Sequence, residues 1–108
     1  MTRYLMIESL DPFDSADTAN FAELAETLAR AGHAVTFFLI QNAVMSARHG
    51  AKPGPFTALA AKGVEILADE FSLRERGISS NQLVAGVKLA PLDVVVDQLA
   101  DGCKALWH

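Results

Sequence analysis

Residues 33–40 are almost unbroken in apolar side chains, and this segment constrains the fold more than any other part of the chain. A strand with one wet face alternates apolar and polar residues, whereas a strand covered on both faces reads as a continuous apolar run. Strands of that kind belong to parallel sheets that have helices on both sides. Further strands are expected at residues 3–8, 64–68 and 103–108.

The segments between these strands carry helix signals. Residues 16–31 repeat apolar side chains at steps of three and four, which predicts a helix with one buried face, and Gly32 follows as its cap. The members of that face are Phe21, Leu24, Ala25, Leu28 and Ala31. Shorter helices are expected over residues 41–50 and 56–62, separated by a loop that contains Pro53, Gly54 and Pro55.

A last helix is expected to begin at Pro91, because proline suits the first turn of a helix. Its apolar face consists of Leu92, Val95, Val96 and Leu99. Residues 79–90 are ambiguous, and residues 83–87 fit either a helix end or a short extended piece. Alternation of strands and helices predicts one α/β domain over residues 1–108, with a mostly parallel sheet of about five strands and helices on both faces.

Composition excludes several classes of function. The net charge is −4, and the nine lysines and arginines form no basic block, so nucleic-acid binding is not expected. There is no apolar run long enough for a membrane span or a signal peptide, and a single cysteine cannot form a disulfide framework. These features predict a cytoplasmic protein.

The apolar fraction of 51% is high for a small domain, and we expect part of this surface to face another subunit. Phe71, Leu89 and Leu92 are among the side chains considered for such an interface. Core packing accounts for most of the others.

Polar side chains follow three of the expected strands. In a parallel sheet the carboxyl ends of the strands meet at one edge, where ligands bind. The expected edge consists of Glu8, Ser9, Asp11, Gln41, Asn42, Asp69 and Glu70. Its carboxylates could hold Mg²⁺, or Asp69 and Glu70 could act as general acid or base. A solvated edge with ion pairs to Arg48, Arg74 or Arg76 is the alternative.

Other candidate groups are weaker. Asp11, Asp14 and Asp17 crowd the first helix start, where they suit capping and the helix dipole and oppose a bound phosphate, so no nucleotide or flavin cofactor is expected. The histidines lack metal-ligand spacing, although His49 could approach the edge if its helix folds back. Cys103 opens the last strand at the opposite end of the sheet, which favours an inert packing role over a nucleophilic one.

The junction after residues 64–68 has a recognisable pattern. Asp69-Glu70 ends the strand, and a short helix follows that is closed by Arg76-Gly77-Ile78. With residues 35–39, 63–67 and 86–87 in order, this pattern resembles the DsrE/DsrF-like family of sulfur-relay proteins over nearly the whole chain. The resemblance implies a three-layer α/β/α fold and dimers, trimers or hexamers, sometimes of different homologous subunits.

The same resemblance raises a conflict about chemistry. Active members pass sulfur as a cysteine persulfide, and their cysteine stands about where Asp69 stands here. The expected function is therefore an accessory or regulatory subunit linked to intracellular sulfur transfer, in contact with DsrE/F/H-like subunits or a sulfur-carrier protein. Two alternatives stay open: an acid/base or metal-dependent enzyme that uses Asp69 or Glu70, and a sulfurtransferase that acts through Cys103.

Overall fold

Five strands form one sheet in the computed structural model, which describes residues 2–12, 15–50 and 55–108. Their order across the sheet is β4-β3-β2-β1-β5, and every neighbouring pair is parallel. The bounds are β1 Arg3–Glu8, β2 Ala34–Leu39, β3 Glu65–Asp69, β4 Val87–Ala90 and β5 Lys104–Trp107. The predicted parallel α/β architecture is confirmed.

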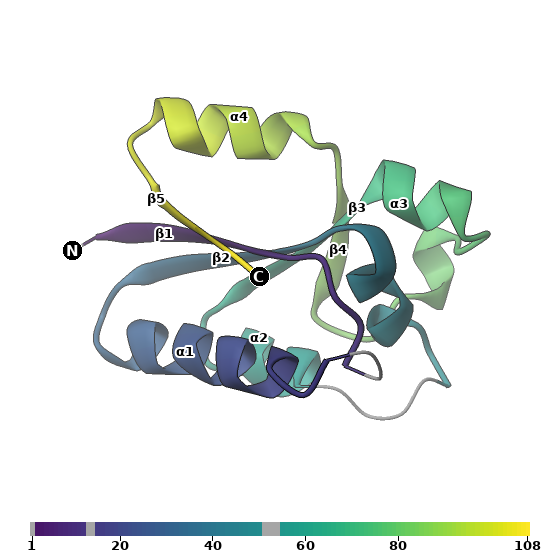
Figure 1. Ribbon diagram of the computed structural model, residues 1–108, viewed down its shortest axis with the longest axis horizontal. Coiled ribbons are helices and arrows are strands. Elements are labelled where there is room, and N and C mark those ends of the chain that lie inside the picture. Colours follow the sequence, from purple (N-terminus) through teal and green to yellow (C-terminus); the bar gives the residue numbers. More distant parts are fainter. Residues whose placement is uncertain (1, 13–14, 51–54) are drawn as a thin grey trace.

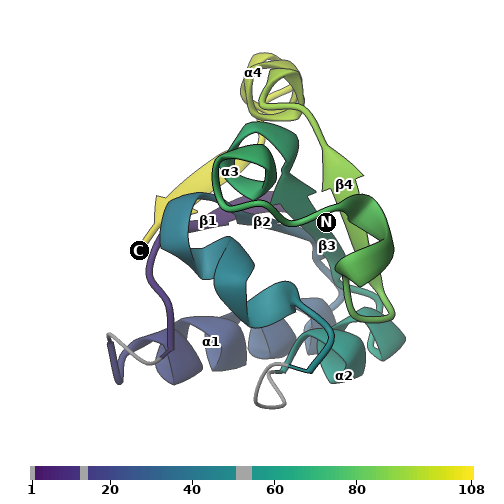
Figure 2. The same cartoon turned by 90° about the vertical axis from the view of Figure 1, so that its right-hand side faces the viewer.

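Helices cover both faces of this sheet (Figure 1). α1 and α2 lie on one face, α4 crosses the other, and η1 and α3 lie at the carboxyl edge of the strands (Figure 2). Their bounds are α1 Thr18–Arg30, η1 Gln41–Ala47, α2 Phe56–Ala61, α3 Glu70–Glu75, η2 Ser80–Gln82 and α4 Asp93–Ala100. In the described part of the chain, no helix has the length and apolar character that crossing a bilayer requires.

The core consists of two unequal clusters, one on each face of the sheet. Phe37 belongs to the larger cluster, which α1 and α2 cover, whereas Phe38 belongs to the smaller one, which includes Val94 and Val95 of α4. Both phenylalanines are fully buried. Adjacent residues of a strand point to opposite faces, so burial of both faces explains why residues 33–40 are continuously apolar.

The expected helix over residues 41–50 is shorter and tighter than predicted. η1 is a 3-10 helix that ends at Ala47, because Arg48 adopts an extended backbone conformation and forms an antiparallel bridge with Leu83. The ambiguous segment after residue 79 is resolved in the same region. Leu83 is extended, but the sheet strand β4 begins at Val87.

Two predicted helix faces are only partly right. On α1, Phe21, Ala25 and Leu28 face the core as expected, but Leu24 and Ala31 are exposed and Ala22 is buried. On α4, Leu92, Val96 and Leu99 all point outward, with Val96 66% exposed. α4 reaches the sheet through Val95, as expected, and also through Val94 and Gln98, whose side-chain amide donates to Thr36 Oγ1 at 3.1 Å.

Gly86 marks the closest approach between α2 and the turn before β4. Its φ is +93°, and a Cβ placed there would lie 2.7 Å from the Ala60 Cβ. Gly102 has a similar φ of +86° but nothing within 4 Å of an added Cβ.

We therefore expect Gly86→Ala to destabilise the protein more than Gly102→Ala. Both variants place an L-residue in a left-handed conformation, at a cost of about 1–2 kcal/mol, but only Gly86→Ala adds a clash worth a further ~1–3 kcal/mol. Denaturant unfolding of both variants measures the difference, and equal losses would contradict the close approach.

Candidate functional site

The polar ends of β1 and β3 lie on the same edge of the sheet but in separate surroundings. β2 lies between the two strands, so Glu8 and Asp69 are two strand spacings apart, about 10 Å. Within residues 2–12, 15–50 and 55–108, no group of three His, Cys, Asp or Glu side chains is placed to hold a metal ion. The Mg²⁺ site that Glu8, Asp11, Asp69 and Glu70 could have formed is therefore not assembled among these residues.

Asp69 serves as the N-cap of α3. Its carboxylate Oδ2 accepts hydrogen bonds from the Ser72 backbone N–H at 3.0 Å and from the Ser72 hydroxyl at 2.7 Å. The side chain is almost fully buried, with 5% of its residue surface exposed. These bonds satisfy a backbone donor that the first turn of a helix leaves free, so the carboxylate stabilises the junction between β3 and α3.

Ser72 extends this network to η1. Its hydroxyl oxygen accepts from the backbone N–H of Gln41 at 2.8 Å. Gln41 has a φ of +51°, a left-handed conformation that is uncommon for a residue other than glycine. Asn42 follows Gln41 in η1, and Arg76 donates to its side-chain oxygen at 3.0 Å. Arg76 also donates to the Ser72 carbonyl at 3.1 Å. The chain thus uses Arg76 to join η1 to α3, rather than to pair with Asp69 or Glu70 as considered.

Glu8 lies in the second environment, at the end of β1. The residue is 3% exposed, and its two carboxylate oxygens lie 3.0 and 2.9 Å from His108 Nδ1. Burial raises the pKa of the Glu8 carboxyl above its ordinary value of 4.5, and the hydrogen bond from His108 opposes that rise. The pair is a carboxyl group and an imidazole in hydrogen-bond contact at the carboxyl edge.

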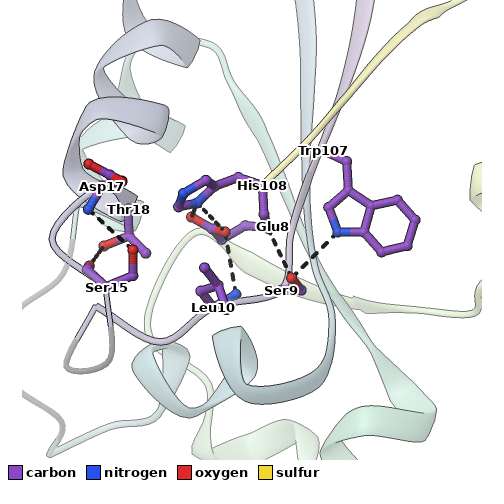
Figure 3. A network of polar contacts seen from close by, with 8 residues as sticks. All are labelled: Glu8, Ser9, Leu10, Ser15, Asp17, Thr18, Trp107 and His108. Carbon is purple, nitrogen blue, oxygen red and sulfur yellow. Dashed lines mark hydrogen bonds and ion pairs between the residues drawn. The ribbon is translucent and has the colours of Figure 1, made fainter.

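Backbone pairing next to β5 holds this pair in place. The N–H of His108 donates to the Ile7 carbonyl at 2.9 Å, and the His108 carbonyl accepts from the Ser9 N–H at 3.0 Å. Ser9 Oγ donates to the same carbonyl and accepts from the indole N–H of Trp107 at 3.4 Å. Figure 3 shows Glu8, Ser9, Trp107 and His108 grouped where the first and last strands run side by side.

A cavity of about 570 Å³ lies between α1, α2 and the sheet, and Glu8 forms part of its wall. Most of the lining is apolar, including Ala22, Phe37 and Phe56, and the polar lining includes Thr18 and Ser46. A volume of this size is in the range of small-molecule sites, which are mostly apolar with a few polar groups.

The sequence model of the DsrE/DsrF-like family matches residues 3–107. The chain belongs to this family. No curated protein sequence matches the chain.

Solved structures share the DsrE-like fold over the full length. The protein of unknown function MTH1491 from Methanobacterium thermoautotrophicum superposes with a TM-score of 0.86 at 17% identity, and both chains are covered completely. The ychN protein from E. coli gives 0.81 at 24% identity, again with complete coverage of both. BT1422 from Bacteroides thetaiotaomicron gives 0.70 at 17% identity, with 98% of this chain and 94% of that chain covered.

Family membership makes the position of the single thiol informative. Cys103 precedes β5 and is half-buried against the cluster that contains Leu5 and Phe38. It therefore lies at the amino end of a strand, whereas Glu8 and Asp69 lie at carboxyl ends. In this DsrE/DsrF-like chain, the cysteine and the carboxyl edge are on opposite ends of the sheet.

The remaining expected site residues are dispersed. Glu70 is half-buried in the first turn of α3, and Asp11 is half-buried with its carbonyl accepting from the Ser15 N–H. Asp17 precedes α1 without a side-chain capping bond, so its expected capping role is wrong, and Asp14 lies outside the described residues.

His49 is exposed, and its N–H donates to the Gln82 carbonyl. Catalysis by Asp69, Glu70 or Cys103 stays a prediction.

Sequence reasoning missed His108. Its role depends on β5 lying beside β1 in a register that pairs Ile7 with Trp107, and this strand order cannot be read from apolar patterns. The cavity was missed because its lining comes from separate segments, including β1, α1, β2, η1 and α2.

We expect Glu8→Gln to change how stability depends on pH. Because the pKa of Glu8 is raised in the folded state, folded protein binds this proton more tightly than unfolded chain does. The free energy of unfolding should therefore fall as pH rises from 4.5 through the raised pKa, by at most about 1.4 kcal/mol per pH unit. The free energy of unfolding of Glu8→Gln should not show this fall with pH.

Denaturant unfolding of wild type and variant across that pH range checks the expectation. Glu75→Gln, which removes an exposed carboxylate on α3, is the matched control and should keep the wild-type profile. Identical profiles for wild type and Glu8→Gln would show that Glu8 is not the group responsible.

Proposed function

We propose that this DsrE/DsrF-like protein is an accessory or regulatory subunit of intracellular sulfur transfer, acting in the cytoplasm without carrying persulfide sulfur at the end of β3. The observation that carries the proposal is the engagement of Asp69. Asp69 stands where the family resemblance expects a cysteine, and its carboxylate is already used to cap α3 and to bind Ser72.

Sulfur relay requires a thiolate, because the ionised sulfur is the group that attacks a persulfide on another protein. A carboxylate cannot form a persulfide. Cys103, the one thiol of the chain, is half-buried at the other end of the sheet, which is unfavourable for exchange with a partner that docks at the carboxyl edge.

The outer surface of α4 supports a role as a subunit. Leu92, Val96 and Leu99 are spaced four and three residues apart, so they form one stripe along the helix, and all three are exposed. Phe71 on α3 is 58% exposed and Leu89 on β4 is also exposed. A stripe of large exposed apolar side chains on one helix face is typical of an interface with another protein.

A sulfur-loading experiment tests the first part of the proposal. After incubation with a persulfide donor, intact mass spectrometry under non-reducing conditions should find no added sulfur on the wild-type protein. Asp69→Cys, made in a Cys103→Ser background, should gain one sulfur atom, at a stability cost of about 1 kcal/mol for the lost cap.

The Cys103→Ser variant alone is the control and should gain nothing. Sulfur on wild-type Cys103 would favour the sulfurtransferase alternative. Failure of folded Asp69→Cys to take up sulfur would show that the end of β3 is not a sulfur-accepting position.

Solution mass tests the second part. Wild-type protein is expected to form an oligomer, and a tagged form should recover sulfur-transfer proteins under conditions that keep persulfides intact. Val96→Asp should dissociate the assembly, because it places a charge in the middle of the apolar stripe. Leu24→Asp, at an exposed apolar residue of α1, should leave it unchanged.

Analytical ultracentrifugation of the three proteins measures the effect. A wild-type protein that is monomeric, and that recovers no sulfur-transfer protein, would contradict the proposal.

A further inference from the structure

The cavity between α1 and α2 has a polar wall that offers acceptors. The hydroxyl of Thr18 donates to the Ser15 carbonyl at 3.0 Å, and the hydroxyl of Ser46 donates to the Ala43 carbonyl at 2.8 Å. A hydroxyl group has one proton to donate and two lone pairs. Since both protons are already used within the chain, these side chains can only accept a hydrogen bond from a molecule in the cavity.

Glu8 adds a further acceptor at the sheet end of the wall. An ionised carboxylate has about four acceptor sites, and the described partners here are His108 Nδ1 and the backbone N–H groups of Ser9 and, at 3.4 Å, of Leu10. Acceptor capacity therefore remains on a side chain that is almost fully buried. A bond to a charged group in such surroundings is stronger than one between neutral groups.

The charged residues of the lining also favour a ligand that donates hydrogen bonds and carries positive charge. In the part of the chain that the structure describes, the charged residues of its lining are Glu8, Glu23, Glu26 and Lys62. Lys62 forms an ion pair with Glu26, which also lies 3.6 Å from Arg30. Glu8 pairs with the His108 imidazole, and Glu23 has no ion pair among the described residues. The described lining thus carries more carboxylates than cations, which disfavours an anion and favours a cation.

From these contacts we propose that the cavity binds a small molecule with an apolar body and a protonated amino group, and that the Glu8 carboxylate anchors this group. Phe37, Phe56 and Ala22 contact the apolar body, and Thr18 and Ser46 accept further N–H bonds. This site is independent of sulfur transfer at the end of β3.

Three probes of nearly equal shape test the preference: phenethylamine as the cation, phenethyl alcohol as the neutral analogue and hydrocinnamate as the anion. Each is titrated into the full-length protein at neutral pH and followed by two-dimensional amide NMR. Phenethylamine should bind at least about tenfold more tightly than hydrocinnamate, with shifts concentrated at the end of β1, in α1 and in α2.

Two variants locate the binding. Glu8→Gln should weaken phenethylamine about tenfold and leave phenethyl alcohol unchanged, because the variant removes the charge and keeps the shape. Ala22→Leu narrows the cavity and should weaken both the amine and the alcohol. Glu75→Gln removes an equal charge from the exposed surface of α3 and should change neither.

Equal or tighter binding of hydrocinnamate, shifts outside the cavity, or binding of none of the probes would each overturn the proposal. So would a loss in Glu75→Gln equal to that in Glu8→Gln, which would indicate an effect of net charge. If Glu8→Gln does not fold, the comparison of the three probes on wild type and Ala22→Leu decides the outcome.

Discussion

Parallel pairing of β1 with both β2 and β5 is the constraint on which most of this structure depends. It places β1 inside the sheet, with β2 on one side and β5 on the other, so Glu8 at its end is buried with the strand. The same register carries His108 to the carboxyl group. A carboxylate in this position would be costly without a partner, and the imidazole supplies one. Pairing of the first and last strands therefore fixes the surroundings of the one carboxyl group that β1 contributes to the cavity wall.

Two separate polar environments follow from the order of the strands. Because β2 lies between β1 and β3, the carboxylates of Glu8 and Asp69 cannot act as one centre. Asp69 is committed to holding α3 and η1 together through Ser72, whereas Glu8 faces the cavity beneath α1 and α2. Hydrogen bonds thus stabilise the junction between β3 and α3, whereas the cavity lies between α1, α2 and the sheet, next to Glu8.

Sequence reasoning reached the fold because its main signals are local. The apolar run before η1 and the glycine after α1 mark strand and helix boundaries without any knowledge of neighbours. It failed where neighbours decide the outcome. Leu24 and Val96 match a helical apolar stripe, yet they face outward because the sheet meets other sides of α1 and α4. Likewise, Asp69 could be placed at the end of β3, but its cap and the partnership of Glu8 with His108 depend on side-chain positions and strand order.

The two outer strands have a consequence for how copies of this chain can meet. β4 and β5 are each four residues long, and they carry Lys88 and Lys104. Short, lysine-bearing borders resist the addition of a foreign strand, since a neighbour would have to bury an ammonium group to extend the ladder. Continuous intermolecular sheets are therefore disfavoured, and any neighbouring molecule is directed to approach by way of the helical layers.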